Sequence, residues 1–156
     1  YTPRVGKGPF PTELFDETGD YIRNAGGEFG TNTGRPRRTG WFDAVIARYA
    51  IRVNGLTEMV INKIDPLRGL PKLKVCVAYA YKGKRIEEFP ADFAELAHCT
   101  PIYEEFDGFT EDITSCRSFE ELPESVQTYI KALERICGCR ISMLGVGPAR
   151  DQVMTL

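Results

Sequence analysis

A run rich in strand-forming residues indicates the fold most clearly, Lys72-Leu-Lys-Val-Cys-Val-Ala-Tyr-Ala-Tyr81. Its polarity alternates, and its β-branched and aromatic side chains favour extended backbone. Lys82-Gly83 then supplies a turn, and a second short strand ending near Phe89 completes a predicted β-hairpin.

Helical and strand patterns alternate on both sides of this hairpin. Before it, residues 43–54 predict a helix with one apolar face, and residues 58–63 predict a short buried strand. After it, we expect a strand over residues 102–106, a helix over 123–136 and a strand over 140–146. The pattern predicts an α/β fold with a mixed, mostly parallel sheet, flanking helices and an antiparallel hairpin.

The first forty residues combine a short strand with turns. Residues 1–6 predict a strand that enters a glycine-rich turn. Pro11-Thr12-Glu13 predicts a helix start capped by Thr12, with Leu14, Phe15, Tyr21 and Ile22 forming its apolar face. Residues 26–40 contain too much glycine for a regular element, so we expect a loop.

Length, charge and cysteine content exclude several classes of protein. A chain of 156 residues fits one domain, and no apolar stretch is long enough for a membrane helix. Residues 1–86 carry 15 basic and 8 acidic residues, whereas residues 87–125 carry 12 acidic residues and one basic residue. This division argues against a nucleic-acid surface and favours a local anion site in the first half. Five irregularly spaced cysteines indicate reduced thiols and a cytoplasmic protein.

The strongest candidate site is the segment 30–40, where Arg35, Arg37 and Arg38 lie among glycines and threonines. Free backbone N–H groups and bidentate guanidinium donors suit a carboxylate or a phosphate. A solvated surface loop with incidental arginines is the alternative.

A second candidate is Asn62-Lys63-Ile64-Asp65, which follows an apolar strand. An Asp carboxylate can accept hydrogen bonds from N1–H and N2–H₂ of guanine, a donor pair that adenine lacks, and the lysine stem can pack on the purine. An ordinary polar strand end is the alternative, since no Gly-x₄-Gly-Lys-Ser/Thr phosphate loop occurs. We expect no metal site, because His98 and the scattered cysteines lack regular ligand spacing.

Several motifs occur in an order that resembles the adenylosuccinate synthetase family. They are Arg4-Val-Gly6, Gly8-Pro-Phe-Pro-Thr-Glu13, Gly27-Glu-Phe-Gly30, Thr33-Gly-Arg-Pro-Arg-Arg-Thr-Gly-Trp41, Lys63-Ile-Asp65 and Gly147-Pro148. The resemblance covers residues 1–156 and matches only the C-terminal portion of that enzyme, a larger single-domain α/β protein.

The resemblance implies a ligase of purine (AMP) biosynthesis that joins IMP and L-aspartate into adenylosuccinate at the expense of GTP. It assigns aspartate binding to the loop Thr31, Asn32, Thr33, Gly34, Arg35, Pro36 and Arg37. It assigns IMP contacts to Val5 and Arg35, and GTP contacts to Arg37, Lys63, Ile64, Asp65, Gly145, Val146 and Gly147. Asn32 and Gly145 stand where the family often has Thr and Ser.

The resemblance also implies what this chain lacks. The phosphate loop, the catalytic Asp and His and the Mg²⁺ ligands would lie before Tyr1, so this chain would contain no catalytic residue. The complete enzyme would be a cytoplasmic homodimer with no nucleic-acid or membrane partner. The alternative is an isolated, non-catalytic fragment that binds guanine nucleotide or anions weakly or not at all.

Overall fold

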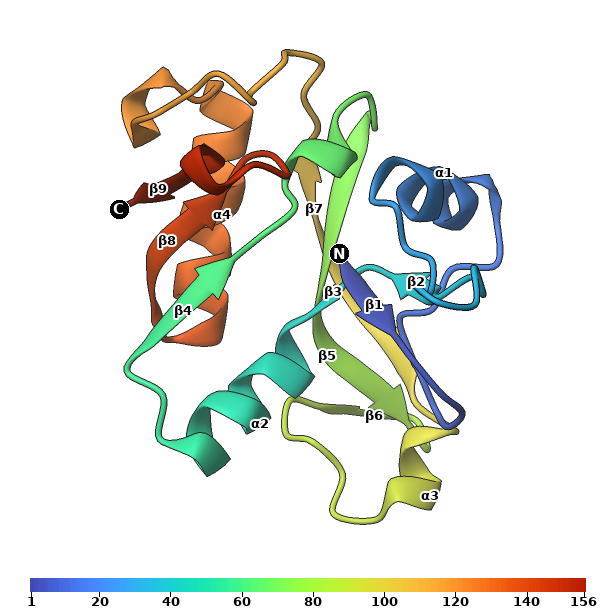
Figure 1. The fold of residues 1–156 in the computed structure, drawn as a ribbon. Coiled ribbons are helices and arrows are strands. Elements are labelled where there is room, and N and C mark those ends of the chain that lie inside the picture. Colours follow the sequence, from blue (N-terminus) through green and yellow to red (C-terminus); the bar gives the residue numbers. More distant parts are fainter. The chain divides into compact units, whose positions relative to one another are not determined.

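The computed structural model describes residues 1–156, which divide into two units. The first unit comprises Tyr1–Tyr49 and Lys74–Glu104, and the second comprises Ala50–Leu73 and Glu105–Leu156. Four α-helices, α1 to α4, and nine strands, β1 to β9, are labelled in Figure 1. No helix combines the length and the apolar character that crossing a membrane requires.

The first unit holds most of the strands. Its elements, three of which continue into the second unit, are β1 (Thr2–Arg4), α1 (Glu17–Ala25), β2 (Arg38–Gly40), β3 (Phe42–Asp43), α2 (Ala44–Asn54), β5 (Lys72–Tyr81), β6 (Lys84–Ile86), α3 (Phe93–Leu96) and β7 (Thr100–Asp107). Strands β1 and β2 form an antiparallel pair. Strand β5 pairs with β3 in parallel and with β6 in antiparallel, and it also pairs with β7.

The predicted hairpin is confirmed. Strands β5 and β6 join through Lys82 and Gly83, whose φ angles of 48° and 75° are those of a tight hairpin turn. Strand β5 has the predicted bounds, whereas β6 ends at Ile86 rather than near Phe89.

A buried carboxyl group fixes the start of α2. Asp43 Oδ1 accepts the backbone N–H groups of Val45 at 3.0 Å and Ile46 at 3.2 Å, and Oδ2 accepts the Tyr79 hydroxyl at 2.6 Å. Burial raises the pKa of Asp43 above its ordinary value, although these three hydrogen bonds oppose the rise. The helix predicted over residues 43–54 is thus confirmed, with Asp43 as its cap rather than its first residue.

Two predictions for the first forty residues are wrong. The helix does not start at Thr12, because Thr12 is fully buried and its carbonyl accepts the Trp41 N–H at 3.1 Å. Asp16 caps α1 instead, and Phe15 is 90% exposed rather than on an apolar face. The predicted loop over residues 26–40 contains β2 at its end, since residues 38–40 pair with β1.

The second unit is built on a three-stranded sheet. Its elements are β4 (Glu58–Ile61), the 3-10 helix η1 (Asp65–Leu67), η2 (Phe119–Glu121), α4 (Glu124–Cys137), β8 (Arg140–Gly145), η3 (Arg150–Gln152) and β9 (Val153–Thr155). Strand β8 pairs with β4 in parallel and with β9 in antiparallel. Since β4 and β8 are parallel neighbours, the segments that follow them leave the sheet at the same edge.

Helix α4 packs beside β8 and carries the core face expected from the sequence (Figure 1). Val126, Tyr129, Ile130 and Leu133 are buried, and the helix ends at Gly138, which has a left-handed φ of 64°. Strand β4 was predicted to be buried, but its residues alternate between exposed and half-buried, and Val60 is 51% exposed.

The α/β class, the mixed strand pairing and the flanking helices agree with the sequence-based prediction, but antiparallel pairs outnumber parallel ones, so the expected mostly parallel sheet is not confirmed. The strands are divided among three sheets. The pairs β3–β5 and β4–β8 are parallel, and β1–β2, β5–β6 and β8–β9 are antiparallel.

Candidate functional site

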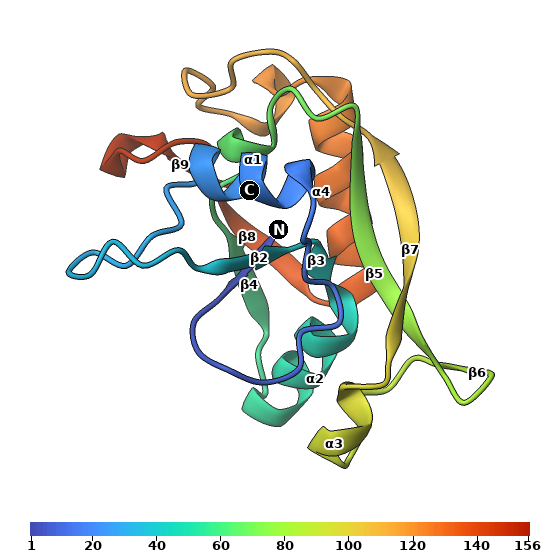
Figure 2. The ribbon, with the colours of Figure 1, turned by 90° about the vertical axis from the view of Figure 1, so that its right-hand side faces the viewer.

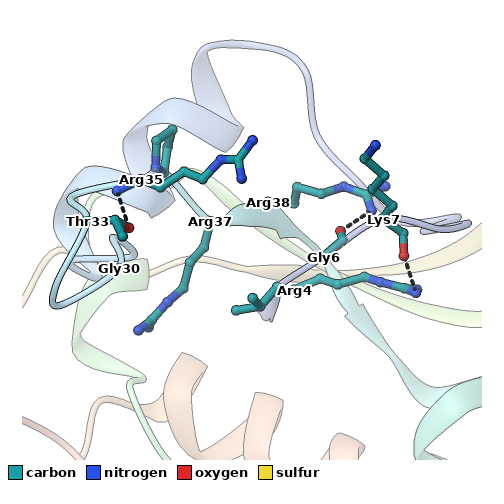
Figure 3. A pocket seen from close by; sticks show the side chains of 10 residues that line it. Arg4, Gly6, Lys7, Gly30, Thr33, Arg35, Arg37 and Arg38 are labelled. Atoms are coloured by element: carbon teal, nitrogen blue, oxygen red, sulfur yellow. Dashed lines mark hydrogen bonds between the residues drawn. The ribbon is translucent and has the colours of Figure 1, made fainter.

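A basic pocket of about 560 Å³ lies in the first unit between the segment after β1 and the loop that precedes β2 (Figure 3). Ten residues line it: Arg4, Val5, Gly6, Lys7, Gly30, Thr33, Arg35, Pro36, Arg37 and Arg38. Five of them are cationic, and none is an acid. The pocket therefore favours an anion.

The loop that carries the arginines folds back on itself as a hairpin whose tip extends outward (Figure 2). The Gly30 N–H donates to the Arg35 carbonyl at 2.8 Å, and the Gly34 N–H donates to the Gly30 carbonyl at 2.8 Å. Gly34 has a φ of 63°, which a side chain would disfavour. These bonds set the positions of Arg35 and Arg37 on the returning arm of the hairpin.

Arg37 is held by a buried acid. Its Nη1 lies 2.9 Å from Oε2 of Glu28, and Glu28 is only 1% exposed. The Tyr1 hydroxyl donates to the other oxygen of Glu28 at 2.7 Å, and the Arg23 Nε donates to the Arg37 carbonyl at 2.9 Å. Arg37 is therefore fixed at the pocket wall, and Glu28 offsets much of its charge.

Arg38 ties β2 to the turn after β1. It binds Glu13 through two parallel hydrogen bonds of 2.8 and 2.5 Å and donates to the carbonyls of Gly6 and Gly8. The hydrogen bonds to Glu13 raise the pKa of Arg38. Arg4 likewise donates to the carbonyls of Lys7 and Pro9 in this turn. Both arginines hold the turn, so their guanidinium groups are largely occupied by hydrogen bonds within the protein.

Arg35 and Lys7 differ from these arginines because their side chains make no hydrogen bond or ion pair within the protein. Both are exposed and line the pocket. In Figure 3 the Arg35 side chain projects to a different side of the loop from that of Arg37. Arg35 and Lys7 are thus the cations best able to bind an anion in this pocket.

The second candidate site lies in the second unit, at the shared end of β4 and β8. Asn62 to Asp65 follow β4, and Gly145 to Gly147 follow from the end of β8. The two segments meet where the Ile64 N–H donates to the Gly145 carbonyl at 3.4 Å. Lys63 has a φ of 58°, a strained backbone for a residue with a side chain and one that is common at functional sites.

Asp65 is the most unusual group of this segment. Its Oδ1 is buried and has no hydrogen-bond partner within the protein. Burial raises the pKa of Asp65 above its ordinary value, and Asp112 adds to the rise, whereas its own backbone N–H and Lys63 oppose it. A buried carboxylate oxygen without a donor is costly, so the site would gain from a ligand that presents N–H groups.

The glycines at the end of β8 and just after it let neighbouring side chains approach the backbone closely. A Cβ added to Gly145 would lie 2.7 Å from Oδ1 of Asn62, and one added to Gly147 would lie 2.5 Å from Cδ of Gln152. Val146 between them is fully buried, and its N–H donates to the Gln152 carbonyl at 2.9 Å. The side chains of Asn62 and Gln152 therefore pack directly against the backbone of this segment.

The structure brings the predicted residues together in two groups. Val5, Thr33, Arg35, Pro36 and Arg37 line the basic pocket, while Thr31, Asn32 and Gly34 lie on the same hairpin outside its lining. The remaining predicted residues, Lys63 to Asp65 and Gly145 to Gly147, flank the joined ends of β4 and β8.

Sequence reasoning missed several residues of these sites. Lys7 was assigned only to a turn, and Glu28 and Glu13 were not paired with Arg37 and Arg38. An isolated acid within Gly27-Glu-Phe-Gly30 was the available signal for Glu28.

No cluster of three or more His, Cys, Asp or Glu side chains could hold a metal ion.

Comparison with known proteins identifies the relatives of this chain. The family model described as adenylosuccinate synthetase matches residues 1–154. The chain is 59% identical over 154 residues to the adenylosuccinate synthetase of Leifsonia xyli, covering 99% of this chain and 35% of the relative. It is 57% identical over 156 residues to that of Kocuria rhizophila, covering 100% of this chain and 36% of the relative.

A solved structure gives the same result for the fold. The fully ligated adenylosuccinate synthetase from Plasmodium falciparum superposes with a TM-score of 0.95 at 38% identity, covering 100% of this chain and 38% of that one. The chain therefore spans about a third of the length of the relatives it matches.

Proposed function

This chain belongs to the adenylosuccinate synthetase family, and we propose that it supplies the aspartate loop and the guanine site of a GTP-dependent ligase. The complete protein would join IMP and L-aspartate to give adenylosuccinate, GDP and phosphate. We place the chain in the C-terminal region of that protein.

The unpartnered oxygen of Asp65 is the observation that supports the guanine site most strongly. Guanine N1–H and N2–H₂ would donate to the two carboxylate oxygens and replace the hydrogen bonds lost on burial. Adenine presents no such donor pair, so Asp65 would select GTP over ATP. Lys63 would pack its stem on the purine, and Gly145 to Gly147 would border the base with backbone.

The basic pocket supports the role of the arginine loop. Arg35 has no internal partner, so it can form paired hydrogen bonds to a carboxylate of aspartate and reach IMP. Arg37, held by Glu28, would contact GTP from a fixed position. Val5 is 81% exposed beside the pocket and would pack on the ribose of IMP. Thr31 to Gly34 would contribute backbone N–H groups and hydroxyls to the aspartate site.

The remaining parts of the reaction are assigned to the part of the relatives that this chain does not span. We propose that the Mg²⁺ ligands of the complete protein lie in that part as well. We propose that the 156-residue chain alone makes no adenylosuccinate, and that the complete protein is a cytoplasmic homodimer.

A steady-state assay tests this function. The full-length polypeptide, supplied with IMP, aspartate, GTP and Mg²⁺, should form adenylosuccinate and should lose that activity when ATP replaces GTP. The pure 156-residue chain should show no turnover under the same conditions. Equal activity with ATP would overturn the guanine site. Turnover by the short chain would overturn the proposal that the catalytic residues lie outside it.

A further inference from the structure

The side chain of Gln152 fills the space beside Gly147, within the segment assigned to the guanine base. Gln152 is the last residue of η3, which lies between β8 and β9. We propose that Gln152 is a positioning residue of the nucleotide site, which holds Gly145 to Gly147 in the shape that receives guanine. This inference rests on the proposed function.

Four hydrogen bonds connect Gln152, the last residue before β9, to the turn that follows β8 and to Thr114. Its backbone carbonyl accepts the Val146 N–H at 2.9 Å, and its backbone N–H donates to the Ala149 carbonyl at 3.0 Å. Its side-chain Oε1 accepts the Ala149 N–H at 2.9 Å, and Nε2 donates to the Thr114 carbonyl at 3.1 Å. The carboxamide therefore ties the turn to a separate segment of the second unit.

The absence of a side chain at Gly147 is what admits this carboxamide. An added Cβ would lie 2.5 Å from Cδ and 2.9 Å from Nε2 of Gln152, closer than side chains approach. The φ angle of Gly147 is not left-handed, so alanine would be disfavoured there by space alone. The carboxamide can rotate away only by giving up its bonds to Ala149 and Thr114. Gly147 and Gln152 are thus a matched pair.

This arrangement has a consequence for binding because the backbone of residues 145–147 would border the base directly. Loss of the Gln152 side chain leaves the Val146 N–H bond in place, since that bond uses the backbone of Gln152. The protein should therefore fold normally, while Gly147 and Ala149 gain freedom that nucleotide binding must remove. The effect should fall on GTP and spare IMP and aspartate.

The first test is Gln152→Ala in the full-length polypeptide. We expect the KM for GTP to rise roughly five- to tenfold, as loss of one or two neutral hydrogen bonds allows, with the KM values for IMP and aspartate and the melting temperature little changed. Gln127→Ala is the matched control. Gln127 Nε2 also bonds a backbone carbonyl, that of Leu122 at 2.9 Å, but its side chain forms no hydrogen bond with residues 145–149.

The second test uses Gly147→Ala, alone and combined with Gln152→Ala. The added methyl group should displace the carboxamide and raise the KM for GTP by a similar factor. The KM for GTP of the double variant should then be no higher than that of the single variant with the higher KM, because both changes remove the same contacts. If Gln152→Ala folds poorly, Gln152→Met keeps the side-chain volume without the bonds and should show the same selective rise.

An unchanged KM for GTP in both Gln152 variants, or factors that multiply in the double variant, would overturn the positioning role. Equal increases for all three substrates would also overturn it, since they indicate a general structural defect. Failure of the guanine site itself would appear instead as activity with ATP in the unmodified protein, which these variants do not affect.

Discussion

The two charged sites differ in how far the protein neutralises its own charge. In the basic pocket of the first unit, Arg37 pairs with Glu28 and Arg38 pairs with Glu13, whereas the side chains of Arg35 and Lys7 have no partner. In the second unit, Asp65 has a buried oxygen with no donor at all. Charged groups that are paired internally build the site, and the groups left unpaired are those a ligand would complete.

Arg35→Ala should produce the largest change in substrate binding, because Arg35 is a pocket cation without an internal partner. Loss of a bidentate, charge-assisted contact should raise the KM for aspartate by about a hundredfold in the full-length polypeptide, with little change in melting temperature. Arg35→Lys should recover only part of the loss, because an ammonium group cannot reproduce the paired geometry.

Arg85→Ala is the control for this change. Arg85 is an exposed arginine that pairs with Glu87 on the hairpin and does not line the pocket, so its loss should leave aspartate binding intact. A similar KM for aspartate in the Arg35→Ala variant and the unmodified protein would contradict the assignment of Arg35 to the ligand.

Arg37→Ala should mainly destabilise the protein, because it leaves the Glu28 carboxylate buried without its cation. Breaking a buried pair is costly, and since Arg37 is about one third exposed we expect a loss of about 2 kcal/mol in the free energy of unfolding. Adding Glu28→Gln should recover part of that loss. Chemical denaturation of the single and double variants measures both values, and an unchanged stability for Arg37→Ala would remove the distinction between paired and unpaired arginines.

The sequence predicted best those elements whose ends are set locally. Helix α4 spans Glu124–Cys137, within one residue of the predicted range 123–136 at each end, and the hairpin turns at Lys82-Gly83 as predicted. The predicted start of α1 was wrong because residues distant in the sequence form hydrogen bonds with this segment. The Leu14 N–H donates to the Thr39 carbonyl and the Thr12 carbonyl accepts the Trp41 N–H, so residues 12–14 pair with β2 and its neighbours instead of forming a helical turn.

The same distinction applies to the sites. The residue types of the arginine loop and of Asn62 to Asp65 suggested their chemistry, but which arginine is free depends on Glu13 and Glu28. Those pairs depend on the hairpin and on the pairing of β2 with β1, which no local sequence pattern shows. The contact of Gln152 with Gly147 likewise depends on the turn between β8 and β9.

Asp65→Asn should give a small gain in stability that depends on pH. Burial raises the pKa of Asp65 above its ordinary value of 3.8, so the folded protein pays a cost when this carboxyl ionises. The cost is complete above the raised pKa and absent below pH 3.8. We expect the variant to be more stable by about 1 kcal/mol at neutral pH without nucleotide, and the gain to vanish as the pH falls through this range. A loss of stability at neutral pH would contradict the unsatisfied state of Asp65.

The preference of Asp65→Asn for GTP or XTP tests the central claim most directly. The asparagine amide replaces one acceptor oxygen with a donor, which faces a guanine N–H unfavourably but suits the carbonyl that xanthine carries in place of the amino group. In the full-length polypeptide, the KM for GTP should rise roughly ten- to a hundredfold while the KM for XTP falls. If GTP is unaffected and XTP gains nothing, Asp65 does not read the base.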